Sequence, residues 1–143
     1  MILVDANIFM YAGGASHPNK APSIALLESI ATGRVDGVID AEILQEILHR
    51  YKSIGRWRDG FKVYDLTRKI VPMVFPITAE VLDIARALLE AHPKLMARDA
   101  LHVAVCIGNS VKTICSYDRD FDDVEEIKRT EPPDLFKFVS AEK

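Results

Sequence analysis

The stretch "MILVDANIFMYA" at residues 1–12 decides the fold, because it places one acidic residue inside an apolar run. Met1 to Val4 has the composition of a short buried strand, and the apolar character resumes at Ile8. Asp5 interrupts the run where that strand would end. A carboxylate beside buried apolar residues needs a compensating partner, and the rest of the chain indicates which one.

Length and composition indicate a single globular domain over residues 1–143. The chain is 49% hydrophobic and 27% charged, and it shows no internal repeat, linker or low-complexity tract. It has no run of about 18 apolar residues to cross a bilayer, and no basic stretch precedes an apolar core as in a signal peptide. We therefore expect a cytoplasmic protein that does not bind membranes, with a loose tail at residues 141–143.

Charge and cysteine content narrow the classes of partner. The net charge is −3, which argues against a protein whose whole surface binds nucleic acid but leaves local binding open. If carboxylates are gathered to hold cations, the formal charge also omits the metals that neutralise them. Cys106 and Cys115 stand in apolar surroundings without the spacing of a zinc site, so we expect two buried thiols.

Strands alternate with helices along the chain. Apolar periodicity predicts helices at residues 19–33, 41–53, 58–70, 79–91 and 96–109, and Asp40 and Thr78 stand as N-caps before two of them. Short apolar runs predict strands at residues 1–4, 35–40, 72–77 and 112–116, with one or two weaker elements after Asp118. This order predicts an α/β fold: a three-layer sandwich with a central, mostly parallel sheet flanked by helices.

Four acidic residues could meet at one edge of this sheet. Asp5 and Asp118 follow strands, and ligands bind at the carboxyl ends of parallel strands, although both residues could also serve as turn or cap residues. Glu46 lies on the flank of its helix, where an ion pair with Arg50 is the simpler interpretation. Asp99 lies in the first turn of an apolar helix, where it could also complement the helix dipole.

Taken together, the four acids favour a metal site. Carboxylates that gather in one crevice repel each other unless cations lie between them. Oxygen ligands suit Mg²⁺ or Mn²⁺ rather than zinc, and such an ion activates water for hydrolysis of a phosphodiester bond. His102 follows Asp99 by three residues on the same helix face. It would orient substrate or a water or, more simply, be satisfied by local hydrogen bonds.

These residues give the chain a resemblance to a known family. The stretches "VDANIFMYA", "DAEILQEILHRY", "ARDALHVAVC" and "ICSYDRDFD" resemble, in order and spacing, a PIN domain of the VapC type from type II toxin–antitoxin systems. The resemblance extends from residue 1 to about residue 123. It implies a Mg²⁺- or Mn²⁺-dependent endoribonuclease that forms a homodimer, with RNA as substrate and a small VapB-like antitoxin as partner.

The resemblance also implies roles for individual residues. The family's four acidic positions, which are both catalytic and metal-binding, fall on Asp5, Glu46, Asp99 and Asp118. Asn7 matches a small polar position and Ser116 a hydroxyl position, both in supporting roles. For a further acid near the metal we choose Asp122 over Asp120 and Asp123, and its role is open.

The segment "HRYKSIGRWRDGFK" at residues 49–62 is a second functional feature. It interleaves basic and aromatic side chains, a mix that binds phosphates and stacks unpaired bases. We interpret it as an RNA-binding edge that carries Arg50, Lys52, Arg56 and Arg58. An equal alternative is a solvated basic helix pair whose aromatic residues pack in the core or in a subunit contact.

Other functions fit the same residues less well. A phosphatase would need a second aspartate where Asn7 stands, and a phospho-receiver would need adjacent acids at the end of the first strand. Within the family, the chain could instead be a nuclease of RNA maturation or decay outside a toxin–antitoxin pair, or a scaffold that binds RNA or a partner without cutting. The presence of all four acids favours a nuclease over a scaffold.

Overall fold

A computed structural model describes residues 1–135 of the chain. Within these residues the strands form one sheet in the order β3-β2-β1-β4-β5, and every neighbouring pair is parallel. The strands are β1 (Ile2–Val4), β2 (Gly37–Asp40), β3 (Val74–Phe75), β4 (Thr113–Cys115) and β5 (Lys128–Thr130). The parallel sheet predicted from the alternation of elements is confirmed.

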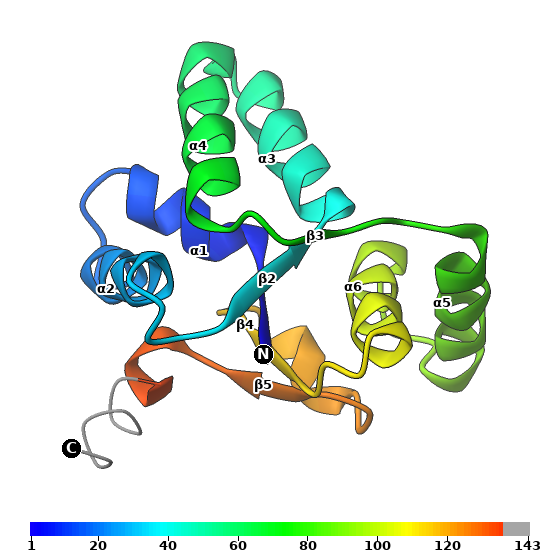
Figure 1. The fold of residues 1–143 in the computed structure, drawn as a ribbon. Helices are drawn as coiled ribbons and strands as arrows, with labels where there is room; N and C mark the ends of the chain where they lie inside the picture. The colour runs from blue at the N-terminus through cyan, green and yellow to red at the C-terminus, as the bar shows by residue number, and fades with distance from the viewer. Residues whose placement is uncertain (136–143) are drawn as a thin grey trace.

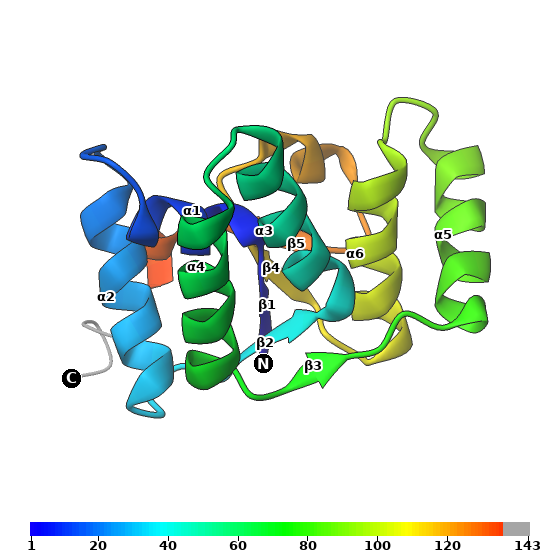
Figure 2. The same cartoon turned by 90° about the horizontal axis from the view of Figure 1, so that it is seen from above.

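Helices flank this sheet. In chain order they are α1 (Ala6–Gly13), α2 (Lys20–Ala31), α3 (Ala41–Ser53), α4 (Trp57–Ile70), α5 (Ala79–Ala91), α6 (Ala97–Gly108) and the short 3-10 helix η1 (Arg119–Asp123). Figures 1 and 2 show α1 and α2 on one side of the sheet and α5 and α6 on the other. α3 and α4 pack side by side as a hairpin at the top of Figure 1. The predicted three-layer arrangement is confirmed.

β1 lies in the middle of the sheet because its side chains are apolar on both faces. Leu3 and Val4 have no exposed surface. Asp5 then ends the strand and begins α1: its Oδ1 accepts a hydrogen bond from the Ala6 N–H at 2.7 Å, and its carbonyl oxygen accepts one from the Ile8 N–H at 3.1 Å. No helix is predicted for residues 6–13, because about two turns give too little periodicity.

Side-chain caps fix the beginnings of two other helices. Asp40 Oδ1 accepts a hydrogen bond from the Ile43 N–H at 2.9 Å, and Thr78 Oγ1 accepts one from the Val81 N–H at 3.2 Å. Each cap satisfies a backbone donor that the first turn of a helix leaves without a partner. Both N-caps predicted from the sequence are confirmed.

The edge strand β3 is shorter than the sequence predicts. β3 has two residues instead of the six predicted at 72–77, since Pro72 and Pro76 flank it and lack a backbone N–H. After Asp118 come η1 and β5, the short elements expected there.

The predicted loose tail at residues 141–143 lies outside the described residues. Within residues 1–135, every helix is too short or too polar to reach across a bilayer.

The core contains both cysteines. Leu3, Ile39 and Ile114 come from three neighbouring strands and are fully buried. Cys106 on α6 and Cys115 on β4 are buried beside them as free thiols, which confirms the prediction. Burial raises the pKa of the Cys106 thiol to about 12 and also raises the pKa of Cys115. Neither thiol ionises at neutral pH, so both act as apolar packing groups.

Candidate active site

Two adjacent strands bring Asp5 and Ser116 to the same edge of the sheet. β1 pairs with β4 so that Val4 lies opposite Cys115, and the Asp5 N–H donates to the Cys115 carbonyl oxygen at 3.0 Å. The Ser116 hydroxyl donates to Asp5 Oδ2 at 2.6 Å. Asp5 is only 6% exposed, so this bond partly satisfies a carboxylate that is almost removed from water.

Asn7 and Ser116 connect Asp5 to the segment after β4. Asn7 Nδ2 donates to Ser116 Oγ at 3.1 Å and to Asp5 Oδ2 at 3.3 Å. Ser116 Oγ also accepts a hydrogen bond from the Asp118 N–H at 2.9 Å. One hydroxyl therefore links the two acids that follow β1 and β4. The supporting roles of Asn7 and Ser116 stay predictions, and these contacts are their geometric basis.

Asp99 and Asp118 lie together with a third acid, Asp120. One carboxylate oxygen of each residue lies within 4.8 Å of the other two. Burial, followed by the negative charges of Asp118 and Asp5, raises the pKa of Asp99 to about 6. The shift reflects the burial of this carboxylate together with its repulsion by neighbouring carboxylates.

Glu46 approaches Asp5 from α3, and His102 approaches both from α6. An oxygen of Asp5, an oxygen of Glu46 and a ring nitrogen of His102 lie within 4.8 Å of one another. The His102 ring lies between two carboxylates: Nε2 is 2.7 Å from Glu46 Oε1, and Nδ1 is 2.7 Å from Asp40 Oδ2. The acids of the site therefore come from the residue after β1, from α3 and α6, and from the segment after β4.

The partners of Glu46 differ from the simplest expectation. An ion pair with Arg50 is the pairing that helix spacing favours, but no such pair forms within residues 1–135. Glu46 instead accepts from His102, and Arg98 Nε lies 3.6 Å from the same oxygen, Oε1. Both partners come from α6, so the side chain of Glu46 joins α3 to α6.

The charges of this cluster are mutually dependent. Burial lowers the pKa of His102, but hydrogen bonds to Asp40 and Glu46 outweigh it and hold the pKa well above its ordinary value. Burial raises the pKa of Asp5, against the opposing effects of His102 and the Ser116 hydroxyl. A positively charged imidazole thus offsets part of the negative charge that the acids bring together.

All four predicted acids line one cleft of about 340 Å³. Its acidic walls are Asp5, Glu46, Asp99 and Asp118. The remaining polar and basic lining side chains are Asn7, His49, Arg50, Ser53 and Arg98. A cleft with several convergent carboxylate oxygens and no thiolate in its lining offers the ligands that Mg²⁺ and Mn²⁺ prefer. The residues present therefore fit a divalent cation.

Asp122, the further acid chosen from the sequence, pairs with Arg129 and not with the other acids of the site. Its Oδ1 pairs with Arg129 Nε at 2.7 Å. The same guanidinium donates from Nη1 to the Ser116 carbonyl oxygen at 3.0 Å and to Glu131 Oε2 at 2.6 Å. The residue that joins Asp99 and Asp118 is Asp120. The geometry thus favours Asp120 over Asp122, and a metal-binding role for Asp122 stays a prediction without contacts to support it.

Two residues take part in ways that the sequence does not predict. Asp40 is predicted only as the cap of α3, yet its second oxygen binds His102. His102 is expected to find local partners, yet Asp40 and Glu46 lie 62 and 56 residues earlier in the chain. The sole local signal is that His102 follows Asp99 by one helical turn, since the pairing itself depends on how the fold brings α6 to the end of β2 and to Glu46 of α3.

A known protein family and curated relatives match most of this chain. The family model described as the PIN domain matches residues 2–127. The chain belongs to the PIN domain family. Among curated relatives, this PIN domain is 45% identical to Ribonuclease VapC13 of Mycobacterium tuberculosis over 129 residues, which are 90% of this chain and 98% of that protein. The resemblance to VapC-type PIN domains is therefore confirmed.

Solved structures share the fold of this PIN domain. VapC20 of Mycobacterium tuberculosis, described as a sarcin–ricin-loop-cleaving toxin, matches with a TM-score of 0.73 and 19% identity over 87% of this chain and 95% of its own. VapBC2 from Rickettsia felis, bound to a DNA fragment from its promoter, matches with a TM-score of 0.70 and 16% identity over 92% of this chain and 98% of its own. At these identities the likeness concerns the fold.

Proposed function

We propose that this PIN domain is a Mg²⁺- or Mn²⁺-dependent endoribonuclease and the toxin of a VapBC-like toxin–antitoxin pair. The observation that carries the proposal is the convergence of four carboxylates, from Asp5, Glu46, Asp99 and Asp118, on one cleft. The name of its relative VapC13, a ribonuclease, supports the same activity. The similarity to VapBC2 supports an antitoxin as partner.

The roles of the residues follow from their contacts. Asp5, Asp99 and Asp118, with Glu46, would hold one or two divalent ions, and Asp120 lies close enough to contribute. Such an ion, when bound, lowers the pKa of water and neutralises the negative charge of the phosphate. Ser116 and the side-chain amide of Asn7 keep the Asp5 carboxylate in place through their hydrogen bonds, as supporting residues of metal sites do.

The test is RNA cleavage by the purified protein. A mixed RNA pool is incubated with the protein in Mn²⁺ or Mg²⁺, beside EDTA and beside the variants Asp5→Asn and Asp99→Asn. Each variant removes one ligand charge at nearly constant volume, so we expect cleavage to fall to the EDTA level while the fold is preserved. Asp83→Asn, on the exposed face of α5, is the matched control and should cut normally.

Two results would contradict the proposal. Unchanged metal-dependent cleavage in both Asn variants would remove the acids from the mechanism. Mn²⁺ binding in calorimetry, together with no cleavage of any RNA, would favour the alternative of a PIN scaffold that binds RNA without cutting. A nuclease of RNA maturation or decay would cut RNA but would have no short neighbouring reading frame that encodes an antitoxin.

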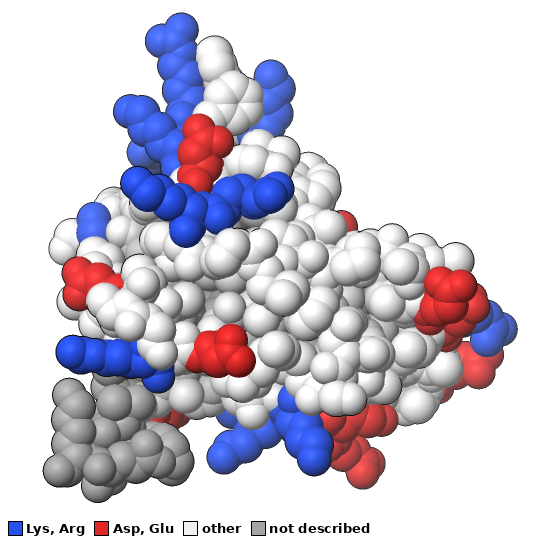
Figure 3. Space-filling view, viewed as in Figure 1, with Lys and Arg blue, Asp and Glu red and all other residues white. Residues whose placement is uncertain are grey.

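The RNA path is proposed to run from the cleft along the α3–α4 hairpin. Arg50 lines the cleft, and Lys52, Arg56 and Arg58 continue from the end of α3 into α4. Figure 3 shows Lys and Arg side chains gathered over this end of the molecule. The polyanionic backbone of RNA would be attracted along this surface, with a strong dependence on salt.

Two aromatic side chains of the hairpin are exposed, whereas Tyr51 of α3 is buried in the core. Trp57 is 42% exposed and Phe61 52% exposed, and the Arg58 guanidinium lies 5.0 Å from the centre of the Trp57 ring. Such rings can stack with unpaired bases, or they can pack against a second copy of the chain in the expected homodimer. We propose the first role for Trp57.

Substitutions in the hairpin test the RNA path without requiring cleavage. In an Asp99→Asn background, Arg58→Glu and Trp57→Ala should both weaken binding of a labelled single-stranded RNA, measured by fluorescence anisotropy. Arg86→Glu on α5 is the matched charge reversal and should bind normally, because α5 lies away from the α3–α4 hairpin (Figure 1). Equal binding by all three variants would contradict this path.

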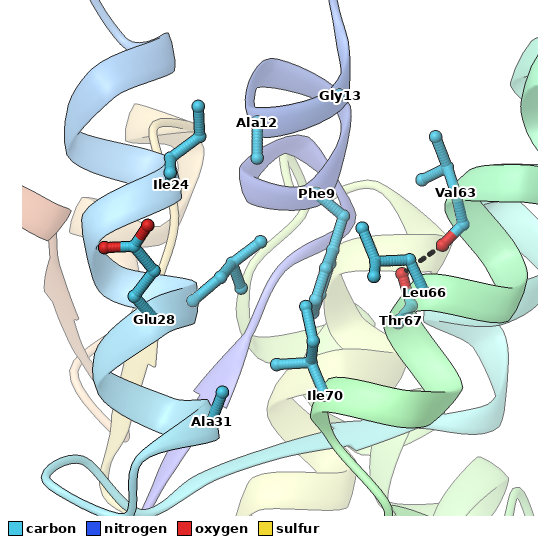
Figure 4. Close-up of a pocket in the computed structure, with 11 residues that line it drawn as sticks. Phe9, Ala12, Gly13, Ile24, Glu28, Ala31, Val63, Leu66, Thr67 and Ile70 are labelled. Atoms are coloured by element: carbon cyan, nitrogen blue, oxygen red, sulfur yellow. Dashed lines mark hydrogen bonds between the residues drawn. The ribbon is translucent and has the colours of Figure 1, made fainter.

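An apolar groove offers a surface for the antitoxin. Figure 4 shows Phe9 of α1, Ile24 of α2 and Leu66 of α4 around a hollow of about 190 Å³. Leu66 is 53% exposed and Ile24 36% exposed, so apolar surface is open to a partner. We propose that an apolar segment of the antitoxin occupies this groove while another part covers the acidic cleft.

Oligomeric state and location complete the proposal. We propose a homodimer from the family resemblance and a cytoplasmic location from the similarity to VapC ribonucleases. Sedimentation analysis of the purified protein tests the homodimer: a monomer at micromolar concentration would contradict it.

Leu66→Glu tests the proposed antitoxin groove, since it should prevent co-purification with the product of a short neighbouring reading frame while leaving metal-dependent cleavage intact.

A further inference from the structure

The ring of His102 completes a chain of three buried side chains. Its Nδ1 lies 2.7 Å from Asp40 Oδ2, and its Nε2 lies 2.7 Å from Glu46 Oε1. The side chain of Asp40 has no exposed surface, that of His102 is 1% exposed and that of Glu46 is 11% exposed. The hydrogen bonds therefore run from the core of the protein to the wall of the acidic cleft.

The inner end of this chain is fixed by the backbone. Asp40 ends β2, and its Oδ1 caps α3 by accepting a hydrogen bond from the Ile43 N–H at 2.9 Å. Its Oδ2 remains for His102. Because both oxygens have a partner, the Asp40 carboxylate has one defined orientation, and the imidazole that it binds is oriented with it.

The outer end of the chain is the carboxylate of Glu46. His102 lies one helical turn after Asp99 on α6, so its contact with Glu46 also fixes the relation between the two helices that carry these acids. We propose that His102, oriented by Asp40, is a positioning residue that holds the Glu46 carboxylate toward Asp5 for metal binding. The inference rests on the proposed metal-dependent nuclease.

His102 itself is not placed to ligate the metal. One ring nitrogen lies within 4.8 Å of oxygens of Asp5 and Glu46, but each ring nitrogen already has a carboxylate partner at 2.7 Å. Arg98 reaches the same Glu46 oxygen at 3.6 Å, but its side chain is 53% exposed and restrains the carboxylate less. Positioning therefore depends mainly on the imidazole.

Two amide substitutions of His102 separate its two contacts. In His102→Gln the amide nitrogen lies near the position of Nε2 and can keep the bond to Glu46, whereas in His102→Asn it lies near Nδ1 and can keep only the bond to Asp40. We expect His102→Asn to lower the affinity for Mn²⁺ by about 10- to 100-fold. His102→Gln should bind Mn²⁺ close to the wild-type affinity.

A second histidine provides the matched control. His92 Nε2 also pairs with a glutamate, Glu126, at 3.2 Å, but it lies outside the acidic cleft. His92→Gln should leave the affinity for Mn²⁺ unchanged. Wild-type affinity in His102→Asn, or an equal loss in the Asn and Gln variants of His102, would overturn the proposal and assign His102 a structural role only.

Calorimetry with Mn²⁺ alone measures this affinity without any RNA. A wild-type protein that binds Mn²⁺ and cuts no RNA would therefore overturn the proposed function and not the role of His102. If a His102 variant does not fold, the wild-type protein still provides a test. A crystal structure of the wild-type protein with Mn²⁺ should show both ring nitrogens of His102 still against Asp40 and Glu46; an ion bound to a ring nitrogen of His102 would overturn the proposal.

Discussion

The Ser116 hydroxyl donates to Asp5 Oδ2 across 2.6 Å and so joins two residues that are 111 positions apart. Ser116 Oγ also accepts hydrogen bonds from the Asn7 side-chain amide and from the Asp118 N–H. This arrangement makes Ser116 the common contact of both strand-end acids. Its removal should affect the site more than the fold.

We expect Ser116→Ala to lower the affinity for Mn²⁺ by about 10- to 100-fold, because the Asp5 carboxylate loses its shortest hydrogen bond. The loss of a donor to a buried carboxylate should also cost about 1–3 kcal/mol of unfolding free energy. Ser23→Ala is the matched control: Ser23 is fully buried, and its hydroxyl has no hydrogen-bond partner within the described residues. Calorimetry and denaturant unfolding of the two variants check both expectations; equal Mn²⁺ affinities would show that Ser116 does not support the site.

Asp120 and Asp122 form a second matched pair. Asp120 lies in the acidic group with Asp99 and Asp118, whereas Asp122 is paired with Arg129. Asp120→Asn should therefore weaken Mn²⁺ binding by about tenfold, and Asp122→Asn should leave it unchanged. Titration of both variants with Mn²⁺ decides between them. A loss confined to Asp122→Asn would restore the residue chosen from the sequence.

The raised pKa of Asp99 makes stability depend on pH and on metal. The folded state keeps the Asp99 proton up to about pH 6, whereas the unfolded chain releases it near the ordinary pKa of 3.8. Between these values the folded state binds more protons, so this group's contribution to stability falls as the pH rises from about 4 to 6 and stays lower above that. A divalent cation offsets the repulsion, so the increase in Tm caused by Mn²⁺ should be larger at about pH 7.5 than at about pH 5.

Thermal unfolding with and without Mn²⁺ at the two pH values measures this difference. Asp99→Asn is the control, because the amide has no carboxylate proton to lose and should show a smaller dependence of Tm on pH. An equal or larger effect of Mn²⁺ at the acidic pH would contradict the expected competition between proton and metal.

The two thiols should be unreactive while the protein is folded. Burial raises the pKa of Cys106 to about 12 and also raises that of Cys115, and both side chains are almost fully buried. Since the thiolate is the reactive form, a disulfide reagent at about pH 8 should modify neither in the native protein and both after denaturation. Rapid modification of the native protein would show that α6 or β4 opens readily.

Much of the fold could be predicted because its signals are local. The caps Asp40 and Thr78, and the apolar strand before Asp5, each depend on neighbouring residues, and the structure places them as expected. α1 gave no comparable signal, because two turns are too short to show a period. β3 is shorter than its apolar residues suggest, because flanking prolines limit its hydrogen bonds.

The site was predictable to the extent that its acids follow strands or lie on amphipathic helices. Asp5 and Asp118 could be placed at one sheet edge from the order of elements alone. The pairing of His102 with Asp40 and Glu46 could not, since it depends on the tertiary arrangement that brings α6 to the end of β2 and to α3. The choice between Asp120 and Asp122 likewise depends on Arg129, which reaches back from β5.

The position of β1 between β2 and β4 has a consequence for how the protein is made. β1, in the middle of the sheet, is synthesised before both of its neighbours, and one of them, β4, begins only at residue 113. A nascent chain therefore carries Asp5 long before Ser116 and Asp118 exist to face it. If the cleft acts as the proposed nuclease, its activity can therefore begin only after Asp118 has been synthesised and has folded into place beside Asp5.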